Sequence, residues 1–198
     1  MVSPAHDPRA AVAAAVKQYR ADADIAKLLA RLDVICAETG DAGALVAAVE
    51  PFREMHEVAG PVYERVVERD PENADALVAL ANAYWLTGRG PDVVGALASR
   101  ALTADPSNRA AWHLWALTEP SPRGRMTRWH QVTTRFPADK LAHAALDDNA
   151  TSVASAENDP VALKLALGTY EMLLADAATD AERVALSSSL GTLRKWKL

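Results

Sequence analysis

The chain has 198 residues, of which 50% are hydrophobic and 24% are charged, and its formal net charge is −5. This balance is typical of a folded globular protein and excludes a disordered chain. No stretch reaches about 18 uninterrupted apolar residues, so the sequence predicts no membrane span.

The amino terminus and the single cysteine bear on the compartment. Residues 1–9 lack the basic region and apolar run that a secretory signal requires. Cys36 has no internal partner for a disulfide, and it follows the apolar residues Val34 and Ile35. We interpret it as a small hydrophobic residue on a helix face, the alternative being a reactive nucleophile. A reduced, cytoplasmic setting is therefore expected.

The amino-terminal third of the chain predicts helices. Residues 8–19 and 24–37 form an expected hairpin, and the second of these helices has its apolar residues at helical spacing. That apolar stripe consists of Ile25, Leu28, Leu29, Leu32 and Ile35. Pro51 should start a new turn or kink the helix, and Gly60-Pro61 should interrupt the helix that begins near Phe52.

A turn signal containing proline recurs in the middle of the chain. It reads Asp70-Pro71-Glu72-Asn73, then Asp105-Pro106-Ser107-Asn108, then Phe136-Pro137-Ala138-Asp139. The interval from Pro71 to Pro106 is slightly longer, and that from Pro106 to Pro137 slightly shorter, than a period of roughly 34 residues. Such a period is typical of a repeat built from helix pairs. The sequence therefore predicts a helical repeat in this region.

The clearest repeat unit covers residues 74–108. Its first helix carries Leu77, Leu80, Ala81 and Tyr84 on one face and should close at Thr87-Gly88. A second helix is expected from about Asp92. The small residues Ala81, Ala98 and Ala101 allow the two helices to approach closely.

On these residues the chain resembles the tetratricopeptide repeat (TPR) family. Leu77, Leu80, Ala81, Tyr84, Ala101 and Pro106 match its unit, and Ala59, Tyr63, Val66 and Pro71 match the second helix of a preceding unit. The resemblance implies an all-α fold, a right-handed superhelical stack of antiparallel helix pairs. It also implies a concave groove, lined by first helices, that binds a peptide or a segment of a partner protein.

The following segments deviate from this pattern. Glu119-Pro120-Ser121-Pro122 cuts a first helix short, and Arg125 stands where a small alanine is usual. We expect a helix over residues 141–146 with a frayed or capped continuation, a helix after Asp159-Pro160, and a last one over 180–196. The predicted divisions are a helical hairpin or cap with a degenerate repeat (1–58), TPR-like repeats (59–137), and a degenerate repeat with capping helices (138–198).

The expected partner-binding residues lie on two successive first helices and in a basic segment. They are Val78, Asn82, Trp85, Arg109, His113, Arg123, Arg125 and Arg128. Residues 109–140 hold six basic and two acidic residues, a net +4, so the arginines could pair with an acidic partner segment. The alternative is a solvated charged loop. Trp112, Trp115 and Trp129 are expected in the core, and the alternative for Asn82 is a solvated helical residue.

Other functions have weaker support. No nucleophile elbow or phosphate loop is present, and the five histidines lack metal-ligand spacing, so we expect no enzyme, no metal and no cofactor. Nucleic-acid binding would rest on the modest charge of residues 109–140. A self-associating structural subunit, such as a homodimer, is the main alternative to a cytoplasmic adaptor that binds a protein or peptide.

Overall fold

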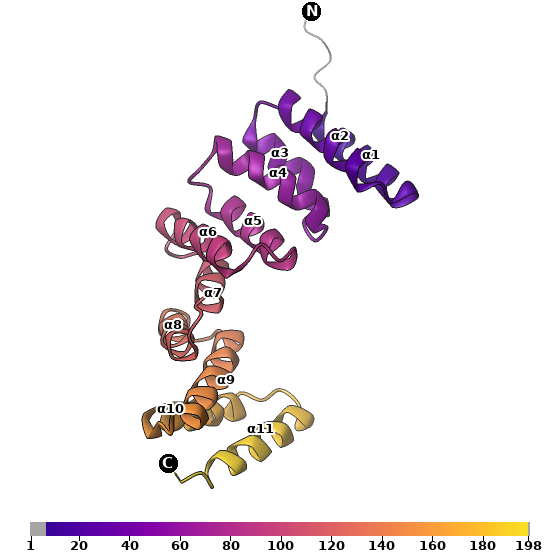
Figure 1. Ribbon diagram of the computed structural model, residues 1–198. Helices are drawn as coiled ribbons and strands as arrows, with labels where there is room; N and C mark the ends of the chain where they lie inside the picture. The colour runs from indigo at the N-terminus through magenta and orange to yellow at the C-terminus, as the bar shows by residue number, and fades with distance from the viewer. Residues whose placement is uncertain (1–6, 198) are drawn as a thin grey trace, which may run out of the picture. The chain divides into compact units, whose positions relative to one another are not determined.

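A computed structural model describes residues 7–197 (Figure 1). Within that range the chain forms eleven α-helices and one short 3-10 turn, with no strand. The helices are α1 (Pro8–Asp22), α2 (Ile25–Glu38), α3 (Ala42–Val49), α4 (His56–Arg69), α5 (Ala74–Leu86), α6 (Pro91–Ala104), α7 (Arg109–Leu117), α8 (Pro122–Arg135), α9 (Lys140–Glu157), α10 (Pro160–Ala175) and α11 (Asp180–Leu193); the 3-10 turn η1 is Glu50–Phe52. The all-α prediction is confirmed.

The helices form two compact units, one ending at Leu114 (unit 1) and one starting at Trp115 (unit 2). In unit 1, neighbouring helices pair as α1 with α2, α3 with α4, and α5 with α6 (Figure 1). Successive pairs stack because α1 contacts α3, α2 contacts α4, and α4 contacts α5. In unit 2, α9 packs against both α8 and α10, and α10 packs against α11. The three-part division at residues 58 and 137 stays a prediction.

The recurring turn signals are helix starts. The side-chain oxygen of Asn73 accepts a hydrogen bond from the Ala76 N–H at 3.0 Å, and that of Asn108 accepts one from the Ala111 N–H at 3.1 Å. Asp139 does the same for the Ala142 N–H at 3.2 Å. Each satisfies a donor that the first turn of a helix leaves unpaired. The repeat period is therefore the distance between successive capping residues.

The shorter of the two proline intervals comes from one helix. α5 has 13 residues and α7 has 9, whereas α6 and α8 each have 14. The difference between α5 and α7 accounts for the shorter interval from Pro106 to Pro137 than from Pro71 to Pro106. The break predicted at Glu119-Pro120-Ser121-Pro122 is thus confirmed as the early end of α7.

Two helix boundaries were predicted wrongly in unit 1. The helix expected from Phe52 begins instead at His56, after η1. Gly60-Pro61 does not interrupt it, because Pro61 lies inside α4. The proline removes one backbone donor near the helix start, and burial of apolar residues on either side holds the helix together. These residues are Val58, Val62, Tyr63, Val66 and Val67.

The helix expected over residues 141–146 is also wrong in its extent. α9 runs without a break to Glu157, through Asp147-Asp148-Asn149. Asn149 donates to the Ala145 carbonyl at 2.8 Å and accepts from the Arg125 Nε at 3.1 Å. Contacts with α8 and α10 thus override the weak helix propensity of this polar tract.

The predicted core is largely present. Leu77, Leu80 and Ala81 are buried in α5; Trp129 is buried in α8, whereas Trp112 and Trp115 are half-buried. Cys36 is buried, as its interpretation as a small hydrophobic residue predicts.

The predicted apolar stripe on α2 splits into two parts. Its residues Leu28, Leu32 and Ile35 are buried, whereas Ile25 and Leu29 are more than 40% exposed. The exposed part of the stripe lines a cavity of about 590 Å³ together with residues of α4 and α5.

No helix in the described range is long and apolar enough to cross a membrane. The prediction that the amino terminus carries no secretory signal falls mostly on residues 1–6, which lie outside the described residues.

Candidate functional site

The outward face of α5 carries the first group of predicted binding residues. Asn82 is exposed, and Trp85 and Leu86 are 39% and 60% exposed. Val78 lies on the same face but is only 2% exposed. The surface available to a partner is therefore formed by the second half of α5, whereas Val78 is buried beneath it.

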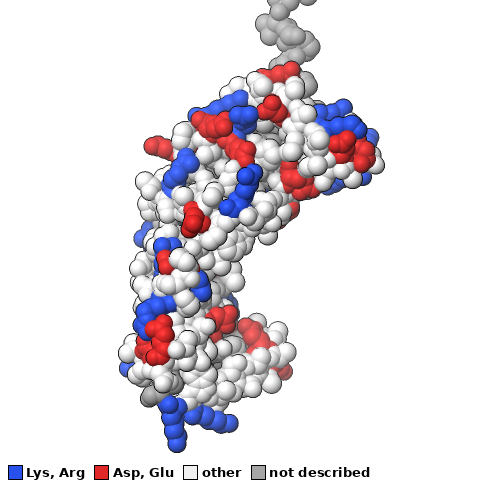
Figure 2. Space-filling model, in the orientation of Figure 1, with Lys and Arg blue, Asp and Glu red and all other residues white. Residues whose placement is uncertain are grey.

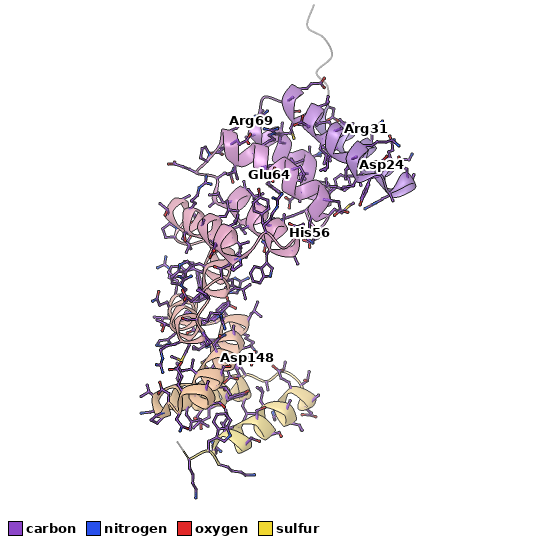
Figure 3. The ribbon with its side chains drawn as sticks, viewed as in Figure 1. Asp24, Arg31, His56, Glu64, Arg69 and Asp148 are labelled. Carbon is purple, nitrogen blue, oxygen red and sulfur yellow. The ribbon has the colours of Figure 1, made fainter. Side chains whose placement is uncertain are left out.

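A small pocket of about 270 Å³ adjoins Asn82. One wall comes from α5 and includes Ala79, Asn82 and Leu86; the other comes from the segment that leads into α4. That second wall consists of Arg53, Glu54 and His56. Figure 3 labels His56 at the start of α4, the helix that packs against α5. An amide, two oppositely charged groups and an exposed leucine thus surround one concavity.

Arg109 and His113 lie one helical turn apart on α7. Arg109 is exposed, and His113 is half-buried. The preceding residue, Asn108, donates from its side-chain nitrogen to the Asp75 carboxylate at 3.0 Å. This bond fixes the start of α7 beside the start of α5, so Arg109 lies near the helix that carries Asn82.

The opposite side of α5 has a structural role. The Tyr84 hydroxyl donates to Glu64 of α4 at 2.7 Å, and the Arg89 guanidinium lies over the Tyr84 ring, 5.2 Å from its centroid. Burial and the bond to Glu64 raise the pKa of Tyr84 to about 12. The hydroxyl therefore stays neutral and ties α5 to α4.

In unit 2, Arg123 bridges three elements. Its guanidinium donates to Glu157 at the end of α9 and to Asp159, both at 2.6 Å. Asp159 is the capping residue of α10 and also accepts from the Val161 N–H at 2.8 Å. These bonds hold the pKa of Asp159 below its usual value, the bond from Arg123 contributing most.

Arg125 and Arg128 close the connection between α7 and α8. Arg125 Nη1 donates to the carbonyls of Glu119 and Pro120, both at 2.9 Å. Arg128 donates to the Trp115 carbonyl and forms an ion pair with Glu119 at 2.8 Å. An arginine at position 125 fits where alanine is usual because its side chain satisfies carbonyls that follow the short α7.

The charged surface is mixed in sign. On the face drawn in Figure 2, basic and acidic side chains are interspersed over unit 1, with no continuous basic area. Nucleic-acid binding needs a basic patch or stripe, and the basic residues best placed for one in unit 2, Arg123 and Arg128, are paired with carboxylates.

Few side chains among residues 7–197 are candidates for metal binding or catalysis. Among residues 7–197, no group of three His, Cys, Asp or Glu side chains is arranged to hold a metal ion. Asp147 is 3% exposed and one of its carboxylate oxygens lacks a hydrogen-bond partner in the described structure. Burial raises the pKa of Asp147 to about 7, and a hydrogen bond from Tyr170 opposes this rise. Asp147 faces the helix packing inside unit 2, and we assign it no catalytic role.

Sequence reasoning missed part of the α5 surface. Leu86 was absent from the predicted set although it follows Asn82 by four residues, the spacing of one helix face. His56, Arg53 and Glu54 could not be found in this way, since only the packing of α4 on α5 brings them to Asn82.

Comparison with solved structures identifies the fold. The chain is similar to pilF of Pseudomonas aeruginosa, with 14% identity, a TM-score of 0.64, and coverage of 95% of this chain and 85% of that one. It is similar to a thermophilic TPR protein of Thermus thermophilus, with 16% identity, a TM-score of 0.54, and coverage of 96% and 100%.

A third similar structure is YrrB, described as a TPR protein with an unusual peptide-binding site. It shares 17% identity with this chain at a TM-score of 0.55, with coverage of 77% of this chain and 81% of that one. No protein-family model and no curated protein matches the sequence. The resemblance to TPR proteins is thus confirmed in the fold, which is a TPR-like α-solenoid.

Proposed function

We propose that this protein is a cytoplasmic adaptor that binds a segment of a partner protein on the outward face of α5. The observation that carries the proposal is the juxtaposition of Asn82 and Leu86 at one pocket, with Trp85 exposed beside it. Large apolar side chains left exposed next to polar groups are typical of protein-binding surfaces. The TPR-like fold supports the same conclusion, since stacked helix pairs present long surfaces to partners.

The groups at this pocket suit a peptide. The amide of Asn82 can donate to a backbone carbonyl and accept from a backbone N–H at the same time. Leu86 and the Trp85 ring supply apolar area for a side chain of the partner. Arg53 and Glu54 lie on the facing wall and could fix its direction through charge.

Arg109 is exposed at the start of α7, and its pairing with an acidic residue of the partner stays a prediction. Partner contacts at Arg123, Arg125 and Arg128 would compete with the bonds these residues make to Glu157, Asn149 and Trp115. We therefore assign the first partner contact to α5 and a mainly structural role to the three arginines of unit 2.

Site-specific photocrosslinking in the native host tests this proposal. A benzophenone amino acid at Leu86 should form a discrete crosslink to one protein, and Asn82→Ala in the same chain should reduce its yield strongly. The matched control is the same amino acid at Val93, an exposed apolar residue on α6. Equal crosslinks from positions 86 and 93, or a yield that Asn82→Ala leaves unchanged, would contradict binding at this pocket. A crosslink to a second copy would instead support self-association.

A further inference from the structure

Unit 2 has a groove between α8 and α10 that none of the predicted binding residues touches. It encloses about 460 Å³, and α9 forms its floor through Leu146. Its wall on α10 is formed by Val161, Leu165, Gly168 and Met172. These positions are four, three and four residues apart, so they follow one face of α10 over three helical turns.

This face of α10 is open to water. Val161 is 75% exposed and Met172 is 41% exposed, although both are large apolar residues. Because these residues are so exposed, the groove is open to solvent along its length, like a trough, and is not an enclosed tunnel. A helix of another protein can cover both walls of a trough, whereas a single acyl chain would leave its own outer side in water.

Gly168 lies on the groove wall with open space in front of it. A Cβ atom at this position would meet no other atom within 4 Å, so packing does not require a glycine here. A glycine inside a helix is less favourable than alanine by about 1 kcal/mol. Glycine at this position therefore makes α10 less stable than alanine would, and it leaves more space between α8 and α10.

The polar groups at the groove are cationic or neutral. Lys164 lines it and forms no ion pair with any described residue, and no carboxylate lines it. His143 Nε2 lies 2.9 Å from the Pro137 carbonyl and so donates to it, while its Nδ1 is buried without a partner in the described structure. The charge at the groove is therefore complementary to carboxylates on the flank of an occupant.

We propose that this groove is a second docking site, which takes an amphipathic helix of a partner protein with an apolar stripe flanked by carboxylates. The apolar stripe would cover Val161, Leu165 and Met172, and a flanking carboxylate would pair with Lys164. Helices dock into apolar grooves of this kind through side chains spaced three and four residues apart. The site is independent of the pocket at Asn82.

Two synthetic peptides test the proposal. Both are 18-residue amphipathic helices with one leucine stripe, flanked by glutamates in the first and by lysines in the second. Fluorescence anisotropy with the full chain should show the glutamate peptide binding at least about tenfold more tightly. Gly168→Leu should weaken that binding about tenfold or more by filling the groove, and Lys164→Glu should remove or reverse the preference.

The controls separate this site from the α5 pocket and from misfolding. Gly191 of α11 also has open space around its Cβ position and lies outside the groove, so Gly191→Leu should bind like the wild type. If the peptide bound at the α5 pocket instead, Asn82→Ala would weaken its binding and Gly168→Leu would not. Circular dichroism checks that each variant folds; if Gly168→Leu does not fold, Lys164→Glu decides.

Three results would overturn the proposal. The first is equal binding of the two peptides or no binding of either, and the second is unchanged binding in Gly168→Leu. The third is a dimer of the wild type that Gly168→Leu dissociates, as seen by mass measurement at several concentrations. That last result would assign the groove to a second copy of this chain.

Discussion

The Arg128 guanidinium lies over the Trp115 ring, 4.5 Å from its centroid, and also donates to the Trp115 backbone carbonyl at 2.6 Å. One side chain of α8 thus covers the last turn of α7 and bonds to one of the carbonyls of that turn. The same guanidinium reaches Glu119 in the connection between the two helices. These contacts explain how α7 can end after nine residues with its carboxyl end satisfied.

We expect Arg128→Ala to destabilise unit 2 by about 2 kcal/mol, from loss of the cation–π contact and of the hydrogen bond to the carbonyl. Arg128→Lys should recover only part of this, because an ammonium group cannot stack and donate in the same geometry. Thermal and denaturant unfolding measure the change. Arg135→Ala, at an exposed position at the end of the same helix, should change stability by about 0.5 kcal/mol or less. Equal effects of the two alanine substitutions would contradict the role of Arg128.

Asp147 predicts an unusual dependence of stability on pH. Burial raises its pKa to about 7 in the folded chain, whereas an unfolded aspartate titrates near 3.9. Between about pH 4 and pH 7 the unfolded chain has lost this proton and the folded chain retains it. The free energy of unfolding therefore falls as pH rises through this range, and Asp147 causes no further fall above pH 7. The groups that face it are Tyr170, Asp148 and, through Tyr170, Ser189.

We therefore expect Asp147→Asn to be more stable than the wild type at pH 8, by at most about 4 kcal/mol, and similar to it at pH 4. Unfolding midpoints of the two proteins across this range provide the measurement. Asp148→Asn, an exposed neighbour, serves as the control. A constant difference between Asp147→Asn and wild type at all pH values would show that Asp147 keeps an ordinary pKa.

Two glycines in helices should respond to alanine with opposite signs. A Cβ at Gly124 would lie 2.6 Å from both Glu119 Oε1 and Ser121 Oγ, the oxygen that caps α8. Gly124→Ala should therefore destabilise, by about 1 kcal/mol if the cap is lost. Gly168→Ala meets open space and should stabilise by about 0.5–1 kcal/mol. Unfolding in urea would show both; two changes of the same sign would contradict the difference in surroundings between the two positions.

Cys36 should be inert in the folded chain. It is 1% exposed, and burial raises the pKa of its thiol, with Arg69 opposing the rise. Because the thiolate is the reactive form, a thiol reagent should modify the native protein at least about tenfold more slowly than the protein in guanidinium chloride. Similar rates in the two conditions would restore the alternative of a reactive cysteine.

The repeat could be predicted from the sequence because its signals are local. A capping residue next to proline, an apolar stripe and a closing glycine each act within a few residues, and α5, α6 and α11 follow from them closely. The exposure of Asn82 and Trp85 follows from the same helical spacing. Pro61 and Asp147 misled the prediction because burial against neighbouring helices outweighs a local preference that opposes the helix.

The candidate sites were harder to predict because they depend on distant partners. Arg123 bonds to Glu157 at the end of the next helix and to Asp159 just after it, and Arg125 bonds to Asn149 of that helix. A net charge of +4 over residues 109–140 does not reveal these bonds. Val78 was expected at the surface, but the packing around α5 covers it.

The four residues by which α7 is shorter than α5 are close to one helical turn. At about 100° per residue, a loss of four residues rotates the following chain by only about 40°, whereas a loss of two would rotate it by about 200°. The chain can therefore leave the shortened helix on nearly the same side of its axis. Shortening by close to a whole turn thus changes the length of a helix and hardly changes the side on which its connection begins.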